Sequence, residues 1–179
     1  MLDMADESAR TTVAQLIDRA DAVVENFRVG IMERWGLGYE TLRERNPKLV
    51  YAAIRGFGDH RTGESPYVEW PAFDVVAQAM GGIMAITGPD AATPTKVGPG
   101  VGDIIPGMML GFGVLAAIHH ARRTGEGQIV DVAMTDAVLA GVSAGVLSVD
   151  GAGVVVRSNR SALDLLGLPE DGVLGRPLT

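Results

Sequence analysis

The sequence predicts an α/β fold in which short apolar strands alternate with helices. Residues 8–20 have apolar side chains at helical spacing, and residues 22–24 form a short apolar strand directly after them. A helix expected over residues 39–45 and a strand over residues 49–54 repeat this order. Such alternation is typical of a parallel sheet covered by helices.

Local signals set the limits of these elements. Val13, Leu16 and Ile17 lie on one face of the first helix, and Asp21 separates that helix from the first strand. Pro47 ends the second helix, because proline has no backbone N–H with which to continue it.

The middle of the chain is predicted to consist of loops and one short helix. Residues 56–71 are rich in glycine, aspartate, serine and proline, which predicts a loop, whereas residues 72–80 are expected to be helical. The pair Gly81-Gly82 interrupts that helix, and residues 88–100 form another loop.

A long helix is expected from about Ile104 to Arg123, followed by a strand at 129–133 and a helix that Thr135 opens as N-cap. The apolar run from Ile104 to Ile118 is shorter than the roughly 20 apolar residues of a membrane span. We therefore expect a buried core helix and no membrane insertion.

The composition argues against several classes of protein. The 179 residues have a formal net charge of -7, whereas a nucleic-acid-binding protein needs a basic surface. The absence of cysteine excludes disulfides and thiolate metal sites, and His60, His119 and His120 form no metal motif. We therefore expect a protein without a metal ion. The acidic N-terminus lacks a signal-peptide core, so we also expect a cytoplasmic protein.

Asp103 is the first candidate for chemistry. It follows the glycines at 98, 100 and 102 and stands at the start of the long helix. An aspartate at that place serves either as a helix N-cap or as a nucleophile beside backbone donors, and the pattern alone favours the cap. Lys96, in the preceding loop, is a candidate contact for an anionic group or an ordinary exposed lysine.

The second candidate is the loop that follows the first strand. Asn26, Phe27 and Arg28 come directly after it, and Arg34 and Trp35 follow shortly. Open α/β sheets bind ligands at the carboxyl ends of their strands, where arginines hold phosphates and aromatic rings stack on planar bases. The alternative is a surface loop with solvated arginines, which the residues alone favour.

Three phrases stand in a fixed order between about Leu2 and Ala140. They are ADAVVENFRVGIMERWGLGYETLRERNPKLVYAAIRGFG, FDVVAQAMGGIMAITG and VGDIIPGMMLGFGVLAAIHHARRTGEGQIVDVAMTDAVL. In this order they resemble the family III CoA-transferases, which include formyl-CoA and carnitine-type CoA-transferases and the related 2-methylacyl-CoA racemases. Together they imply a partial Rossmann-like parallel layer and a long core helix.

The resemblance implies an acyl-CoA:carboxylate CoA-transferase in which Asp103 matches the catalytic aspartate. In that mechanism the carboxylate attacks an acyl-CoA, and an aspartyl-CoA thioester then passes CoA to a carboxylic acid acceptor. Coenzyme A is thus a substrate, and the resemblance places Asn26, Phe27 and Arg34 at its binding site.

Phe73 bears on two alternatives. The racemases have a histidine base where this chain has Phe73, which cannot accept a proton, so racemase activity is the second choice among enzymes. A catalytically inactive remnant or an interaction module with a sensory-type tail is the alternative from a different class.

The sequence also differs from the family that it resembles. This sequence corresponds to the middle of the enzyme, with residues 1–144 as its core fragment. Residues 145–179 are expected to be either the first part of a PAS domain, a small α+β sensor that they resemble from about Leu147, or an unrelated fused tail. We expect the isolated chain to be unstable or to aggregate, and the family's homodimer cannot be carried over.

Overall fold

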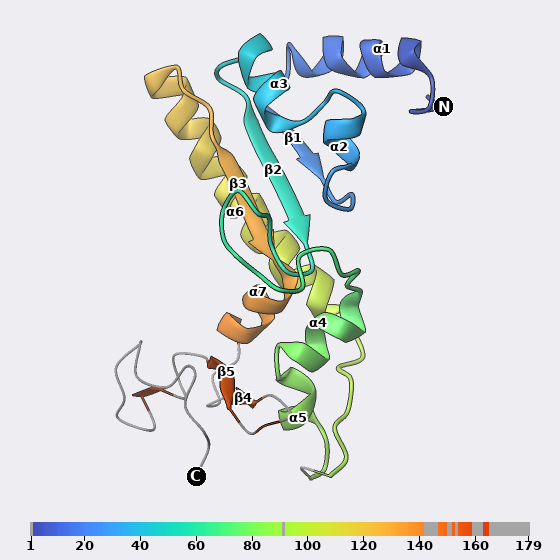
Figure 1. The fold of residues 1–179 in the computed structure, drawn as a ribbon. Helices are drawn as coiled ribbons and strands as arrows, with labels where there is room; N and C mark the ends of the chain where they lie inside the picture. The colour runs from blue at the N-terminus through green and yellow to red at the C-terminus, as the bar shows by residue number, and fades with distance from the viewer. Residues whose placement is uncertain are drawn as a thin grey trace. The chain divides into compact units, whose positions relative to one another are not determined.

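The computed structural model divides the chain into two compact units (Figure 1). The first unit comprises Met1–Pro71 and Gly107–Ala133, and the second comprises Ala72–Pro106 and Met134–Thr179. The residues that the structure describes are 2–90, 92–141, 147–149, 152, 154–158 and 163–164.

The first unit is a three-stranded parallel sheet with helices on both faces. Its strands are ordered β1-β2-β3, so β2 is central and pairs with both neighbours. Val23 lies opposite Tyr51, and Tyr51 lies opposite Ile129. The elements of this unit, together with the long helix that extends into it, are α1 (Glu7–Ile17), β1 (Ala22–Glu25), α2 (Ile31–Arg34), α3 (Tyr39–Arg45), β2 (Val50–Arg55), α6 (Val101–Thr124) and β3 (Ile129–Ala133).

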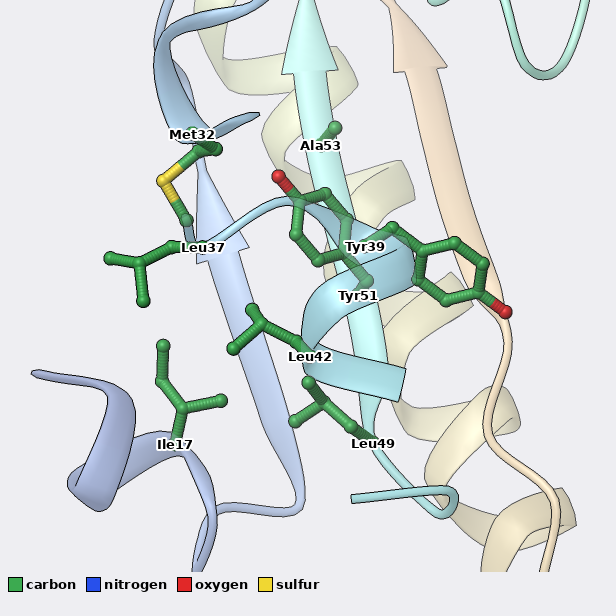
Figure 2. Close-up of a cluster of buried hydrophobic side chains, with 8 residues drawn as sticks. All are labelled: Ile17, Met32, Leu37, Tyr39, Leu42, Leu49, Tyr51 and Ala53. Carbon is green, nitrogen blue, oxygen red and sulfur yellow. The ribbon is translucent and has the colours of Figure 1, made fainter. Parts of the chain in front are cut away.

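One face of β2 is covered by α1, α2 and α3. Tyr51 and Ala53 point to this face, where Leu42 of α3 is fully buried. Burying a leucine in this way contributes about 1.5–3 kcal/mol. The cluster drawn in Figure 2 is formed by Ile17, Met32, Leu37, Tyr39, Leu42, Leu49, Tyr51 and Ala53.

Helix α6 covers the opposite face of the sheet. Val50 points to this side because side chains alternate along a strand, and it packs against Ala117 and Ala121. The other face of α6 has exposed apolar side chains, among them Phe112 and Leu115. By length and composition, α6 is the one candidate membrane span in the described part of the chain, which is weak evidence for membrane insertion. Only 22% of its apolar window is buried, so the buried core helix expected from the sequence is mostly not buried in this structure.

The second unit is built around helices that pack closely. A Cβ atom added to Gly81 would lie 2.6 Å from a methyl group of Val138, so the end of α4 touches α7 directly. The elements of this unit are α4 (Asp74–Met80), α5 (Ile83–Thr87), the first residues of α6, α7 (Met134–Gly141), β4 (Leu147–Val149) and β5 (Val155–Ser158).

The predicted order of helices and strands is confirmed, with two corrections at helix starts. Helix α6 begins at Val101, so Asp103 lies inside its first turn and is not the N-cap. Helix α7 begins at Met134, which makes Thr135 a fully buried helical residue instead of the cap. The short helices α2 and α5 were not predicted.

In the tail, β4 and β5 pair antiparallel. Most of residues 159–179 lies outside the described part of the chain, and the PAS-like assignment stays a prediction.

Candidate functional site

The loop that leaves β1 presents two of the predicted residues. Asn26 is exposed and its amide nitrogen donates to the Ile54 carbonyl at the end of β2 (3.4 Å). Phe27 is 46% exposed, and its ring makes a T-shaped contact with the ring of Trp35, with centroids 5.0 Å apart. Arg34, next to Trp35, ends α2 with an exposed side chain.

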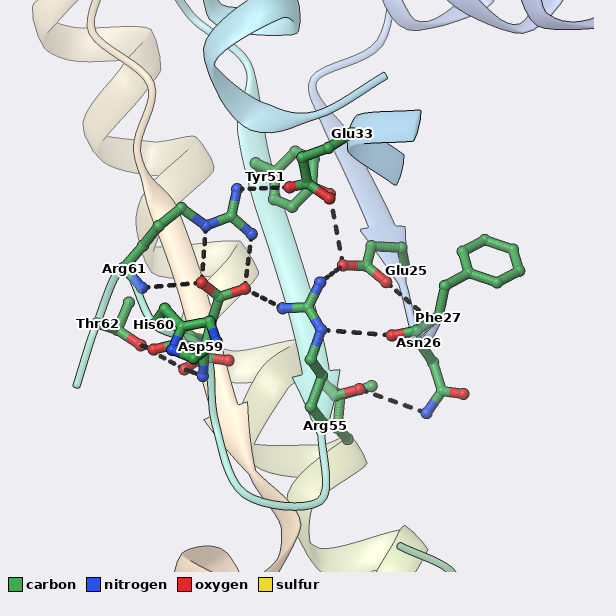
Figure 3. A network of polar contacts seen from close by, with 12 residues as sticks. Glu25, Asn26, Phe27, Glu33, Tyr51, Arg55, Asp59, His60, Arg61 and Thr62 are labelled. Carbon is green, nitrogen blue, oxygen red and sulfur yellow. Dashed lines mark hydrogen bonds and ion pairs between the residues drawn. The ribbon is translucent and has the colours of Figure 1, made fainter. Parts of the chain in front are cut away.

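Glu25 and Arg55 hold the backbone of this loop in place through hydrogen bonds. The Phe27 amide donates to Glu25 Oε2 (2.7 Å), and Arg55 Nε donates to the Phe27 carbonyl (3.3 Å). Arg55 also forms a buried ion pair with Glu25 (Figure 3). The ends of β1 and β2 thus hold Phe27 through charge-assisted hydrogen bonds, which are stronger than neutral ones.

The same arginine joins this loop to the loop after β2. Arg55 forms a second ion pair with Asp59, whose carboxylate also accepts two hydrogen bonds from the Arg61 guanidinium (2.8 and 2.6 Å; Figure 3). The Asp59 amide donates to Asp131 Oδ2 in β3 (3.0 Å). In the described part of the chain, Asp131 Oδ1 is the one buried side-chain oxygen without a hydrogen-bond partner.

The two buried carboxyl groups beside Arg55 differ in acidity. Burial raises the pKa of Glu25, and the charge of Arg55 opposes this without cancelling it. Burial also acts to raise the pKa of Asp59, but hydrogen bonds from Arg61 and the charge of Arg55 outweigh it and lower that pKa to about 2. Asp59 is therefore ionised at neutral pH.

This edge of the sheet is chemically suited to a nucleotide-like ligand. It lies at the carboxyl ends of parallel strands, where open α/β sheets bind ligands. Arg28 and Arg34 are exposed cations, and Phe27, which is also exposed, directly precedes Arg28 in sequence. Cations of this kind bind phosphate, and the ring face suits a planar base.

The supporting residues were missed by the sequence analysis. Glu25 and Arg55 each end an apolar strand, and a charged residue at that position was the available signal. Asp59 and Asp131 had no local signal that distinguishes them from loop and strand residues.

Asp103 lies in the second unit, in the first turn of α6, with its side chain exposed. Its backbone amide donates to the Gly100 carbonyl (3.1 Å). Within the described residues, no hydrogen bond or ion pair engages its carboxylate. Lys96, the other candidate in this region, pairs with Asp74 (2.9 Å) and not with Asp103. Asp103 therefore has the accessibility that a nucleophile requires.

The described residues contain no group of three or more histidine, cysteine, aspartate or glutamate side chains that could hold a metal ion.

Comparison with known proteins decides the family. The sequence matches CoA-transferase family III over residues 1–164. The chain belongs to CoA-transferase family III. It is 54% identical over 138 residues to a succinyl-CoA:mesaconate CoA-transferase of Haloarcula hispanica, covering 77% of this chain and 35% of that relative. It is 42% identical over 138 residues to a formyl-CoA:oxalate CoA-transferase of Streptomyces avermitilis, covering 77% of this chain and 32% of that relative.

The fold of this CoA-transferase family III chain also has solved counterparts. A CAIB/BAIF family protein from Brucella suis superposes with a TM-score of 0.73 at 38% identity, covering 79% of this chain and 36% of that one. The chain thus spans about a third of the length of the relatives that it matches. The family confirms the α/β class and the long helix predicted from the sequence.

Proposed function

We propose that this chain contributes to an acyl-CoA:carboxylate CoA-transferase and that Asp103 is its nucleophile. The observation that carries the proposal is the exposed Asp103 carboxylate behind a glycine-rich loop, in a stretch shared with CoA-transferases. A carboxylate free of ion pairs keeps its lone pairs available for attack on a thioester.

The proposed reaction begins when the Asp103 carboxylate attacks the thioester carbonyl of an acyl-CoA. The carbon–sulfur bond breaks, so a mixed anhydride forms and CoA thiolate leaves. The thiolate attacks the Asp103 carbonyl of the anhydride, which releases the first acid and leaves an aspartyl-CoA thioester. An acceptor carboxylate repeats both steps in reverse and departs as the new acyl-CoA, regenerating Asp103.

Asn26, Phe27 and Arg34 are proposed to bind CoA. The exposed Arg34 supplies positive charge that can bind a phosphate group of CoA. Phe27 offers an apolar ring, and hydrogen bonds to Glu25 and Arg55 hold the backbone of this residue in place. A fixed loop loses little conformational entropy when the ligand binds, which favours affinity.

Racemisation is less well supported. Removal of an α-proton requires a positioned base, and Phe73, a 69% exposed residue directly before α4, has no basic atom in its side chain.

The test is covalent capture. The chain is incubated with succinyl-CoA, formyl-CoA or acetyl-CoA, and intact mass is measured before and after hydroxylamine, which cleaves thioesters. We expect an adduct of one CoA less one water that is absent in Asp103→Ala and present in the control Asp90→Ala, an exposed loop carboxylate. Arg34→Ala should raise the acyl-CoA concentration needed for half-maximal labelling. No adduct with any donor would contradict the proposal and favour an inactive remnant.

A further inference from the structure

Two polar side chains of α4 hold the loop that precedes Asp103. Gln78 is fully buried, and its Oε1 accepts a hydrogen bond from the Val97 amide (2.8 Å). Its Nε2 donates to the Pro99 carbonyl (3.4 Å) and to Asp74 Oδ1 (2.9 Å). A buried amide with both ends satisfied fixes its partners, because each lost hydrogen bond would leave a buried polar group unpaired.

Asp74 ties α4 to the first turn of α6. Its Oδ1 accepts a hydrogen bond from the Gly102 amide (2.8 Å), and its Oδ2 pairs with Lys96 (2.9 Å). The first amides of a helix have no intrahelical acceptor, so Asp74 supplies the capping acceptor from another helix. Burial acts to raise the pKa of Asp74, but hydrogen bonds from Gln78, Lys96 and the Gly102 amide outweigh it and lower that pKa.

Gly102 permits this close approach. A Cβ atom at position 102 would lie 2.5 Å from the Asp74 carbonyl oxygen and 3.1 Å from Ala77 Cβ. The first turn of α6 therefore rests directly on α4, and Asp103 is the next residue along. The place of the Asp103 backbone depends on the contacts of Asp74 and Gln78.

We propose that Asp74 and Gln78 are positioning residues for Asp103, holding residues 97–102 so that its carboxylate stays accessible in one place. The inference rests on the proposed function for its catalytic consequence. The structural part of the inference, that Asp74 and Gln78 hold the Gly102 amide and the loop at residues 97–100, does not depend on that function. A misplacement of a reacting group by 1 Å can lower a rate about 100-fold, so loss of these contacts should affect the rate more than substrate binding.

The experiment compares Asp74→Ala, Asp74→Asn and Gln78→Met with Asp90→Ala. Asp90 is a matched control, since it accepts hydrogen bonds within its own loop from the Ala92 amide (3.0 Å) and Thr93 Oγ1 (2.9 Å). Two quantities are measured on the full chain: hydrogen exchange of the peptide covering residues 97–103, and the rate constant of adduct formation across succinyl-CoA concentrations.

Asp74→Ala and Gln78→Met should raise amide exchange in that peptide about 10-fold or more and lower the maximal labelling rate about 100-fold. The half-saturating succinyl-CoA concentration should stay within about twofold, which separates positioning from binding. Asp74→Asn keeps an acceptor for the Gly102 amide and should recover part of both losses. Asp90→Ala should match the unaltered chain.

The inference would be overturned if amide exchange in the peptide 97–103 were unchanged in both Asp74→Ala and Gln78→Met. It would also be overturned if the unaltered chain forms the CoA adduct and both variants form it at the same maximal rate. If the unaltered chain is not labelled at all, the proposed function fails, and the exchange measurement still decides whether Asp74 and Gln78 hold the loop. Far-UV circular dichroism confirms that the variants compared are folded, and Asp74→Asn, the mildest change, keeps the test decisive if Asp74→Ala does not fold.

Discussion

Replacing Gly102 by alanine measures how closely α6 rests on α4. The added Cβ would lie 2.5 Å from the Asp74 carbonyl oxygen and 3.0 Å from Asp74 Oδ1, and the first of these is a backbone atom that cannot rotate away. Reaching the 3.4 Å limit of ordinary contact requires a displacement of about 0.9 Å. Overpacking of this kind costs about 1–3 kcal/mol.

Gly107→Ala is the matched control, because nothing lies within 4 Å of a Cβ at that position of the same helix. Alanine gains about 0.5–1 kcal/mol over glycine in a helix, so Gly107→Ala should be stabilising. Gly102 lies in the first turn of α6, where alanine gains less over glycine than in the middle of a helix, so Gly102→Ala should be less stable than Gly107→Ala by at least the overpacking cost, about 1–3 kcal/mol. Urea denaturation followed by circular dichroism measures it. Equal stability of the two variants would refute the reasoning.

Two further predictions concern the buried charges of the first unit. Arg55→Met leaves Glu25 buried without its cation and leaves Asp59 with Arg61 alone, so it should cost about 3–5 kcal/mol in urea denaturation. Arg45→Met, which removes the exposed pair with Asp18, should have a much smaller effect on stability; equal losses of stability in the two variants would contradict this. Because the pKa of Asp59 is lowered from 3.8 to about 2, the folded state favours its ionised form by about 2 kcal/mol. That stability is present above the unfolded pKa and is lost as pH falls from 3.8 to about 2. The difference in unfolding free energy between the unaltered chain and Asp59→Asn should therefore narrow on acidification, and a constant difference would count against the assignment.

The fold was predictable where its causes are local. The limits of α3 and β3 agree with the predicted residues because Pro47 and the apolar run at 129–133 act within a few positions. The start of α6 was mispredicted because its first turn is capped by Asp74, which lies 28 residues before Gly102 in the chain. Local sequence does not contain that contact.

The exposed residues of the candidate site could be proposed from the sequence, whereas the buried charged residues that hold them in place could not. Phe27 was predicted as a candidate because it follows a strand and matches the pattern of the family that the sequence resembles. Arg55 contacts Phe27 from 28 residues away, and Asp59 contacts Asp131 from 72 residues away. Such pairs follow from the register of the sheet, which the sequence predicts only in outline.

The order of strands has a consequence during synthesis. The second neighbour of β2 is β3, and Ile129 pairs with Tyr51, which the ribosome adds 78 positions earlier. At about 5–20 residues per second, one edge of β2 waits roughly 4–16 s for its partner while the intervening segment is made. Helix α6 ends at Thr124, just before β3, so for most of that interval the apolar side chains of Val50 and Ala52 have no complete α6 to cover them, and exposed apolar surface of this kind promotes aggregation.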